Sequence, residues 1–369
     1  MFSDKTAFFT YLMEKAILRT VVKYFCSGDN MCGDRKMFNR IWGIPFSLLV
    51  SYSSRLRNYL VDNCYFGLPR FVQIETTTKC NLGCRYCERN KDESRVVNSD
   101  MSLDFFSSIV SQLRYPTQCI QLVGLGEPLL NPEIFSMIHF AKKKGFEVSL
   151  IDNFTLIDRD KSLALINSGL SFLYVSFDSV SKNTFEEIRT GACFEKVVEN
   201  IKLFVKTKKE AKAKKPDFLF KSTISQSNFA EIPQLIRLAE DLGADGINFG
   251  KLMSENDSCA NQSSVLLKEE DLPRSKIAIY PCELSKSYQC DAIKGCYVTF
   301  DGKVLPCGLM AESVSRAQYA QLQLGDLNLD KIANIWRANS YRKFRNKIGL
   351  TEFLPQCKTC LGNKSKSLA

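Results

Sequence analysis

Residues 69–90 read PRFVQIETTTKCNLGCRYCERN, and this stretch decides how the rest of the chain is interpreted. Its first part, residues 71–76, is rich in β-branched and aromatic side chains, which predicts a strand. The loop after it carries Cys80, Cys84 and Cys87 in a CxxxCxxC spacing. Thiolates this close together can ligate one metal ion or one iron–sulfur cluster. A structural zinc site needs four ligands, and the next cysteine or histidine is Cys119, so the three thiolates favour a [4Fe–4S] cluster with one iron open to an external ligand.

The rest of the composition points to sulfur chemistry rather than histidine chemistry. The 369 residues include 15 cysteines and one histidine, His139, which excludes any metal site built from several histidines. Residues 1–20 lack the uninterrupted apolar core of a signal peptide, and no apolar run approaches the roughly 20 residues of a membrane-spanning helix. These features predict a cytoplasmic protein, in which clustered cysteines more often bind metal than form disulfides.

From residue 71 onward, short runs of β-branched and aromatic residues alternate with segments of helical period. Further strands are expected at 119–123, 146–151, 172–177, 218–223 and 247–252, and helices near 103–114, 132–144, 159–168, 182–206 and 229–242. Strands joined by helical crossovers pair in parallel. Residues 71–255 are too few for an eight-stranded barrel, so this α/β pattern predicts a partial (β/α)6 barrel with parallel strands, or an open sheet. In either fold, chemistry belongs in the loops at the C-terminal ends of the strands.

Two regions flank the predicted barrel. Residues 1–70 are expected to form a helical, basic N-terminal extension, and residues 256–369 a small Cys-rich C-terminal domain. The C-terminal region contains a hairpin pattern that turns at Asp301-Gly302, followed by a helix over 329–347. The net charge is +10, and a basic run over Lys206–Lys215 is interpreted as the solvated end of a helix. No nucleic acid partner is therefore expected.

The segment 69–90 resembles the signature segment of the radical SAM superfamily. The resemblance implies a [4Fe–4S] cluster on Cys80, Cys84 and Cys87, with S-adenosylmethionine (SAM) on the open iron. Reduction of such a cluster cleaves SAM to a 5′-deoxyadenosyl radical, which abstracts a hydrogen atom from the substrate. Tyr86 holds the position that lies against the adenine in the family. The implied partners are a small-molecule or peptide substrate and a low-potential electron donor such as a flavodoxin or ferredoxin.

Three further segments extend the resemblance along the predicted barrel. Residues 124–128, GLGEP, are similar to the family's GGEP element, with Leu125 in place of the first glycine of the pair. Asn153 matches one position of a Thr-Asn-Gly element, and Ser176-Phe177-Asp178 with Arg189 resembles an SxD…R element whose Ser and Arg hold the SAM carboxylate and ribose. Arg189 could alternatively be a solvated helix residue. The residues that the resemblance assigns to cofactor binding are Tyr86, Gly124, Gly126, Glu127, Pro128, Asn153, Ser176 and Arg189.

The C-terminal cysteines resemble the SPASM/twitch extension of radical SAM enzymes, which binds auxiliary iron–sulfur clusters. The spacing from Cys290 through Gly302 to Cys307 fits the first half of that pattern. Cys357 and Cys360 would complete a set of four, which indicates one auxiliary [4Fe–4S] cluster. Cys296 is an alternative to Cys290, and a zinc-ribbon-like site on the same four cysteines remains open, because spacing alone does not separate iron–sulfur from zinc.

The reaction expected from these features is hydrogen abstraction by a radical SAM oxidoreductase or modifying enzyme. A short auxiliary region favours a small polar substrate, such as a sugar or cyclitol, with the auxiliary cluster taking up an electron. A peptide- or protein-modifying SPASM maturase is the alternative, and a non-catalytic iron–sulfur or zinc-binding protein is a third hypothesis. Lys221 and Arg189 are candidates for removing a proton from a radical intermediate, because their segments are expected to face the site.

Overall fold

The computed structural model describes residues 67–91, 97–251, 272–280, 294–308, 311 and 319–348. The helical extension predicted over residues 1–70 lies almost entirely outside the described residues. So do three of the four predicted auxiliary ligands, Cys290, Cys357 and Cys360.

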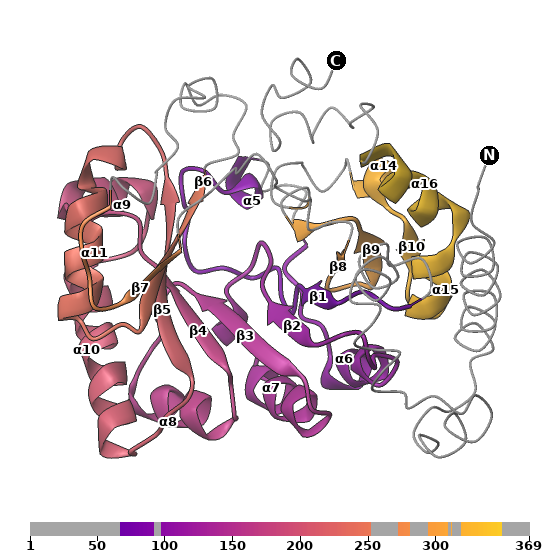
Figure 1. The fold of residues 1–369 in the computed structure, drawn as a ribbon, viewed down its shortest axis with the longest axis horizontal. Coiled ribbons are helices and arrows are strands. Elements are labelled where there is room, and N and C mark those ends of the chain that lie inside the picture. Colours follow the sequence, from indigo (N-terminus) through magenta and orange to yellow (C-terminus); the bar gives the residue numbers. More distant parts are fainter. Residues whose placement is uncertain are drawn as a thin grey trace, which may run out of the picture. The chain divides into compact units, whose positions relative to one another are not determined.

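A ten-stranded sheet forms the centre of the described structure, in the order β10-β9-β8-β1-β2-β3-β4-β5-β6-β7 (Figure 1). The strands are β1 Phe71–Ile74, β2 Cys119–Leu122, β3 Glu147–Asp152, β4 Phe172–Ser176, β5 Asp217–Ile224, β6 Gly246–Lys251, β7 Ala278–Tyr280, β8 Gly295–Val298, β9 Lys303–Leu305 and β10 Gly325–Asp326. Neighbours are parallel from β8 through β1 to β7, whereas β9 and β10 are antiparallel additions. The predicted parallel α/β fold is confirmed.

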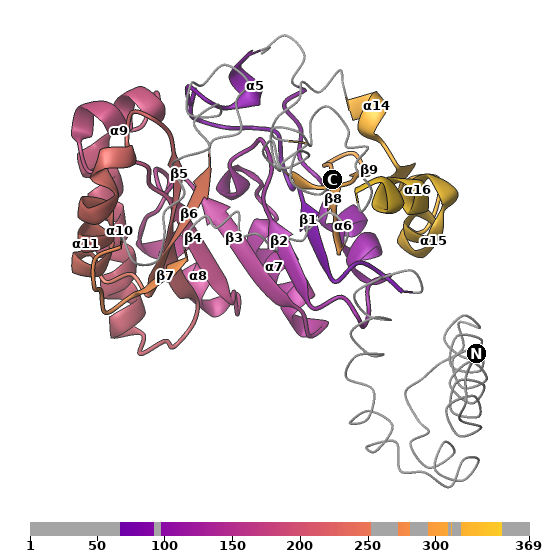
Figure 2. The ribbon, with the colours of Figure 1, turned by 45° about the horizontal axis from the view of Figure 1, so that its top comes forward.

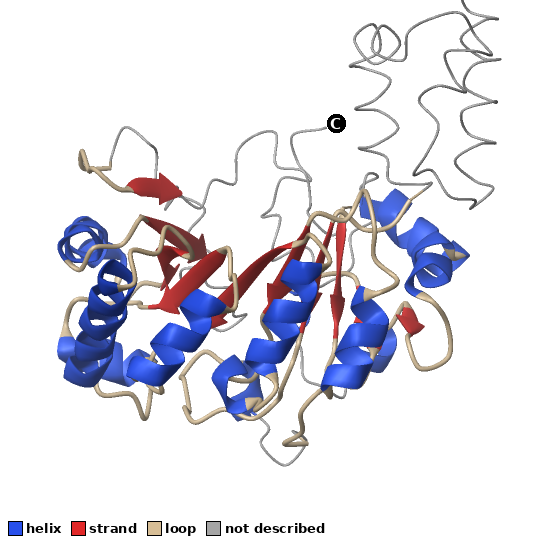
Figure 3. Cartoon of the chain, turned by 90° about the horizontal axis from the view of Figure 1, so that it is seen from below, coloured by secondary structure: helices blue, strands red, loops and turns tan. Residues whose placement is uncertain are grey.

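The helices between the strands cover one face of this sheet (Figures 2 and 3). All helices that the structure describes, in this layer and elsewhere, are α5 Glu88–Lys91, α6 Leu103–Val110, α7 Ile134–Lys143, α8 Arg159–Asn167, α9 Lys182–Ile188, α10 Phe194–Glu210, α11 Ile232–Asp241, α14 Tyr319–Leu322, α15 Ile332–Arg337 and α16 Asn339–Ile348. Two short 3-10 turns are η2 Pro128–Leu130 and η3 Phe229–Glu231. None of the described helices is long and apolar enough to cross a membrane.

Strand β5 shows which side chains face these helices. The ring of Phe218 lies 5.3 Å from that of Phe204 on α10, and the ring of Phe220 lies 5.2 Å from that of Phe177, so the even-numbered side chains of β5 pack under the helices. Because side chains alternate along a strand, Lys221 and Thr223 lie on the opposite face. We call this opposite side the inner face of the sheet.

The structure corrects the predicted elements in three places. The helix expected over 182–206 is two helices, α9 and α10, because Gly191 between them has a φ of 94°, in the left-handed region that an α-helix does not use. The helix expected over 329–347 is likewise divided into α15 and α16. Strand β7 was not predicted, since it is only three residues long.

The C-terminal hairpin forms where the sequence places it. Gly302 has a φ of 87°, and a Cβ there would lie 2.7 Å from the ring of Phe105, so the turn requires glycine. Strand β8 pairs in parallel with β1, from Phe71 opposite Gly295 to Ile74 opposite Val298. The described part of the C-terminal region therefore continues the sheet of the barrel, and domain boundaries at residues 70 and 255 remain predictions.

Candidate active site

The loop that carries the three cysteines leaves the C-terminal end of β1 and is held by backbone hydrogen bonds. The amide of Gly83 donates to the carbonyl of Thr190 over 2.8 Å, and the amide of Arg85 donates to the carbonyl of Ile188 over 2.9 Å. This loop, residues 75–87, therefore packs against the C-terminal end of α9 and the residues that follow it. We call it the cysteine loop.

The three thiols are half-buried at this position. Burial raises the pKa of the Cys84 thiol, and the nearby Arg189 guanidinium opposes that shift by stabilising the thiolate. The sulfur atoms of Cys80, Cys84 and Cys87 do not all lie within 4.8 Å of one another, the spacing expected of ligands to one ion. Thiolates that bind different irons of a cluster lie farther apart than ligands of one ion. Three thiolates without a fourth ligand therefore fit a [4Fe–4S] cluster better than a single zinc ion.

The side chain of Arg189 is 16% exposed and pairs with Asp178, so the alternative that Arg189 is a solvated helix residue is wrong. Its Nε and Nη2 atoms each lie 2.7 Å from Oδ2 of Asp178. The other oxygen of Asp178 accepts from the amide of Thr223 over 2.7 Å. Burial opposes the charge of Arg189, but Asp178, Cys84 and Cys87 raise its pKa above the ordinary value. A permanent positive charge therefore lies beside the thiolates.

The glycines of the GLGEP segment are required by protein neighbours. A Cβ on Gly126 would lie 2.2 Å from the carbonyl oxygen of Thr77, and one on Gly124 would lie 2.5 Å from Cγ of Glu75. Both neighbours belong to the cysteine loop. These contacts explain the two glycines without a bound ligand: they let the loop after β2 pass closely beside the cysteine loop.

Glu127 is fully inside the protein, and its contacts are with the backbone. Its amide donates to the carbonyl of Lys79 over 2.7 Å. Its carboxyl oxygens accept from the amides of Leu129 over 3.2 Å and Asn153 over 2.9 Å. Pro128, also buried, opens the short turn η2 directly after it. Glu127 thus ties the end of β2 to the end of β3 and to the cysteine loop.

Asn153 is a second residue that links the end of β3 to the cysteine loop. Its Nδ2 donates to Oδ1 of Asn81, inside the cysteine loop, over 3.0 Å. Its Oδ1 accepts from the amide and hydroxyl of Thr155 over 2.9 and 2.6 Å, while Nδ2 of Asn81 donates to that same hydroxyl over 2.7 Å. Sequence reasoning missed Asn81 and Thr155, because no motif marks them.

Ser176 and Tyr86 are the remaining predicted cofactor residues. Ser176 ends β4 and is buried, and its hydroxyl makes no hydrogen bond within the described residues. Tyr86 is half-buried in the cysteine loop, with the Arg85 guanidinium 5.5 Å from the centre of its ring. All predicted residues from Tyr86 to Arg189 thus belong to the cysteine loop or to the ends of β2, β3 and β4 and the segments that follow them.

A buried pair of carboxyl groups underlies the site. Asp152 accepts from the amide of Phe154 over 2.6 Å, next to the amide of Asn153 that binds Glu127. Burial, followed by the proximity of Asp152, raises the pKa of Glu127 well above its ordinary value, and burial also raises the pKa of Asp152. Two carboxylates in this position cannot both be charged without a large cost, so the pair retains a proton.

We therefore expect Asp152→Asn to reduce the pH dependence of stability. A raised native pKa stabilises the fold at pH values below the unfolded pKa, and that contribution is lost as pH rises through the native pKa. The asparagine amide can donate to an ionised Glu127 and still accept from Phe154. Urea unfolding at pH 5 and pH 8 should show a smaller loss of unfolding free energy in the variant, with each pKa unit removed worth about 1.4 kcal/mol. Asp160→Asn, on the exposed first turn of α8, is the control, and an unchanged loss in Asp152→Asn would contradict the shared proton.

The predicted auxiliary site is described at one ligand only, the half-buried Cys307. The amide of the next residue, Gly308, donates to Oε1 of Gln73 on β1 over 2.9 Å. Cys296, the alternative to Cys290, is enclosed in β8, and burial raises its pKa to about 12. Cys290 itself lies outside the described residues, so the choice between these two cysteines stays a prediction.

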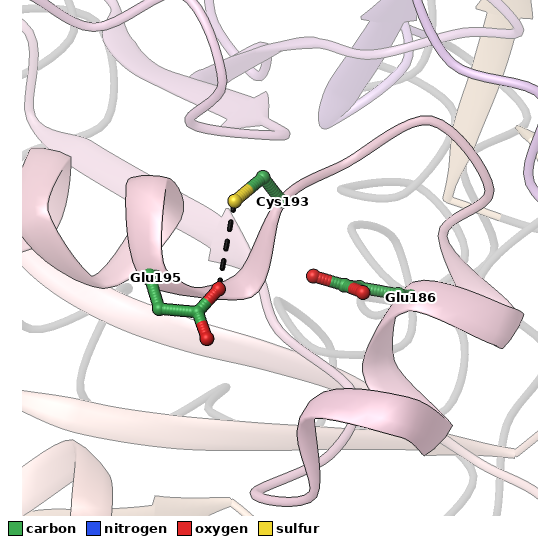
Figure 4. Close-up of side chains that lie close together, drawn as sticks. All are labelled: Glu186, Cys193 and Glu195. Atoms are coloured by element: carbon green, nitrogen blue, oxygen red, sulfur yellow. Dashed lines mark hydrogen bonds between the residues drawn. The ribbon is translucent and has the colours of Figure 1, made fainter.

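A second group of side chains meets the spacing for a single ion: Glu186, Cys193 and Glu195 (Figure 4). Each already has a protein partner. Sγ of Cys193 lies 3.5 Å from Glu195, which also pairs with Lys182, and Glu186 accepts from the amide of Phe194. Cys193 and Glu195 are exposed, so this group is an ordinary surface network.

The fold and the site together define an α/β iron–sulfur protein with a three-thiolate loop at the end of its first barrel strand. Residues 74–213 match the family model described as the radical SAM superfamily, and residues 290–361 match that of SPASM, an iron-sulfur cluster-binding domain. The chain therefore belongs to the radical SAM superfamily and carries a C-terminal SPASM domain, and these domains imply a [4Fe–4S] cluster, SAM and auxiliary clusters. The SPASM match begins at Cys290.

Curated relatives match most of the chain at low identity. A tungsten-containing aldehyde ferredoxin oxidoreductase cofactor-modifying protein of Pyrococcus furiosus is 23% identical, covering 79% of this chain and 87% of the relative. An AdoMet-dependent heme synthase of Methanosarcina barkeri is 26% identical, covering 79% and 91%, and a PqqA peptide cyclase of Gluconobacter oxydans is 24% identical, covering 79% and 82%. The crystal structure of Streptococcus suis SuiB bound to its precursor peptide SuiA superposes with a TM-score of 0.57 at 14% identity, covering 92% of this chain and 79% of SuiB, which supports the fold.

Proposed function

We propose that this protein is a radical SAM enzyme that modifies a peptide. The observation that carries the enzymatic part is the cysteine loop, with Cys80, Cys84 and Cys87 held at the C-terminal end of β1 beside a buried Arg189. The match to a PqqA peptide cyclase along 79% of the chain supports the peptide part. A peptide substrate therefore takes precedence over the sugar or cyclitol that the sequence first suggested. None of the relatives described above supports a sugar or cyclitol.

The residues of the site divide into two groups by their contacts. Cys80, Cys84 and Cys87 would hold the cluster, which when bound with SAM supplies a 5′-deoxyadenosyl radical. Ser176, whose hydroxyl makes no hydrogen bond within the described residues, and Tyr86 would contact SAM directly.

Glu127 and Asn153 are assigned a different role, because their polar atoms are already bonded to protein. They are positioning residues that fix the cysteine loop. Gly124 and Gly126 have the same role through their close contacts with that loop, and Pro128 through the turn that it opens. Arg189 supplies the fixed positive charge beside the thiolates, and its pairing with Asp178 argues against its acting as the proton acceptor.

The auxiliary site is assigned to Cys290, Cys307, Cys357 and Cys360. Cys307 is next to Gly308, which is bonded to Gln73 on β1, so this ligand is anchored to the barrel itself. Four thiolates leave no iron open to substrate, so this site would accept or pass an electron. A flavodoxin- or ferredoxin-like donor would supply electrons to the protein.

The test is anaerobic reconstitution with iron and sulfide, followed by incubation with SAM, dithionite and a pool of synthetic peptides. We expect 5′-deoxyadenosine to form and at least one peptide to lose two hydrogen atoms, detected by mass spectrometry. Absence of 5′-deoxyadenosine under strong reduction would contradict the radical SAM reaction. A haem precursor in place of the peptides tests the second candidate, haem synthesis, which the relative from Methanosarcina barkeri favours.

A further inference from the structure

A row of polar side chains crosses the inner face of the sheet beside the proposed SAM site. Ser176 of β4 pairs in register with Lys221 of β5, Lys221 with Asn248 of β6, and Asn248 with Tyr280 of β7. We call Lys221, Asn248 and Tyr280 the polar row. Since Ser176 is the next residue in the same register, the polar row lies at the depth of the barrel where the cofactor residues end β4.

The exposure of neighbouring positions confirms that the polar row faces away from the helices. Val175 precedes Ser176, and Phe220 and Ile247 precede Lys221 and Asn248 on their strands. All three preceding side chains are completely buried under the helices. Lys221 and Asn248 are half-buried, and Tyr280 is 48% exposed. Side chains that alternate between two faces thus alternate between closed and open surroundings. The polar row is accessible from the inner face.

Lys221 is the charged member of the row, and it has no counter-ion within the described residues. Its Nζ makes no ion pair and no hydrogen bond there, and neither do the side chains of Asn248 and Tyr280. The carboxylates around it are engaged elsewhere. Asp178 binds Arg189 and the amide of Thr223. Glu231 binds Ser179.

Three further carboxylates among the described residues of the sheet are also engaged. Glu75 accepts from the amides of Leu125 and Phe300. At the other end of the strands, Asp217 pairs with Lys215 and Glu147 with Lys142. A partly desolvated ammonium group without a protein counter-ion is stabilised by any anion that binds to it.

We infer that the polar row binds a carboxylate of the substrate, with Lys221 as its cation and Asn248 and Tyr280 as neutral hydrogen-bond donors. The inference rests on the proposed function for the choice of a peptide, and it names an Asp or Glu side chain, or the C-terminal carboxylate, as the group recognised. A substrate anchored one strand away from Ser176 has its reacting carbon beside the cofactor. Lys221 is then a binding residue rather than a proton acceptor.

The inference is tested by residue-resolved acylation of lysines in the reconstituted protein with SAM bound. Three probes are compared: a peptide pool rich in Asp and Glu, a matched pool in which Asn and Gln replace them, and glutarate. We expect the acidic pool and glutarate to protect Lys221 from the acylating reagent, and the amide pool not to protect it. Lys202, exposed on α10, serves as the internal control. Protection by glutarate alone would support the carboxylate site while contradicting the peptide substrate, and protection by no probe would overturn the inference.

Variants separate this site from the SAM site. Lys221→Met should weaken binding of the acidic pool by about tenfold or more, the loss expected for a charge-assisted hydrogen bond, whereas Lys221→Arg should retain most of it. Lys202→Met carries the same change of net charge and should have no effect. SAM affinity is measured in the same samples, and Lys221→Met should bind SAM as the unchanged protein does. Loss of SAM affinity in that variant would assign the carboxylate to SAM and overturn the inference.

Discussion

Cys84→Ala is expected to abolish formation of 5′-deoxyadenosine and to remove about half of the iron bound after reconstitution. The cluster proposed for the cysteine loop would have three protein ligands, so the loss of one would leave too few thiolates to retain it. With four irons in each of two clusters, the content should fall from about eight to about four per chain. Iron analysis, absorbance and a SAM cleavage assay on the same sample measure the three effects together.

The matched control for this change is Cys193→Ala. Cys193 is an exposed cysteine at the start of α10, and its thiol hydrogen-bonds the side chain of Glu195. Iron content and SAM cleavage should therefore remain those of the unchanged protein. If Cys84→Ala kept its full iron content, the assignment of the cluster to the cysteine loop would be wrong.

The sequence predicted the elements of this fold whose pattern is local. Strands β1 to β6 were placed to within two residues, because each is a short β-branched and aromatic run between helical segments. The division of α9 from α10 was missed, although Gly191 marks it, because the apolar period continues across the break. The pairing of β8 with β1 joins residues more than two hundred positions apart, and no local pattern indicates such a contact.

The candidate site was predictable in its residues but not in its contacts. The motifs identified Glu127 and Gly126, yet the carboxyl group of Glu127 accepts from the amide of Asn153, and Gly126 lies against the cysteine loop. Asp178 belongs to the SxD motif, but the motif does not indicate that its carboxylate holds Arg189 in place. Partners of this kind depend on which strand ends meet in three dimensions. The loop after β1 has little helix or strand of its own. Its shape is therefore set by contacts with the ends of β2, β3 and α9.

Arg189→Met is expected to destabilise the protein by about 3–5 kcal/mol, because it leaves the carboxylate of Asp178 buried without a cation. Chemical denaturation measures this loss. SAM cleavage should fall as well, since the positive charge beside Cys84 and Cys87 is removed. These two effects need to be separated, because a less stable protein also loses activity.

The double variant Arg189→Met with Asp178→Asn separates them. It removes both charges, so the uncompensated carboxylate disappears and most of the stability should return. SAM cleavage should stay low, because the charge beside the thiolates is still absent. Recovery of activity together with stability would show that Arg189 serves the fold alone. The amide of Thr223, which donates to Oδ1 of Asp178, keeps an acceptor in the asparagine side chain, so the only polar group that loses its partner is the neutral amide nitrogen in place of Oδ2.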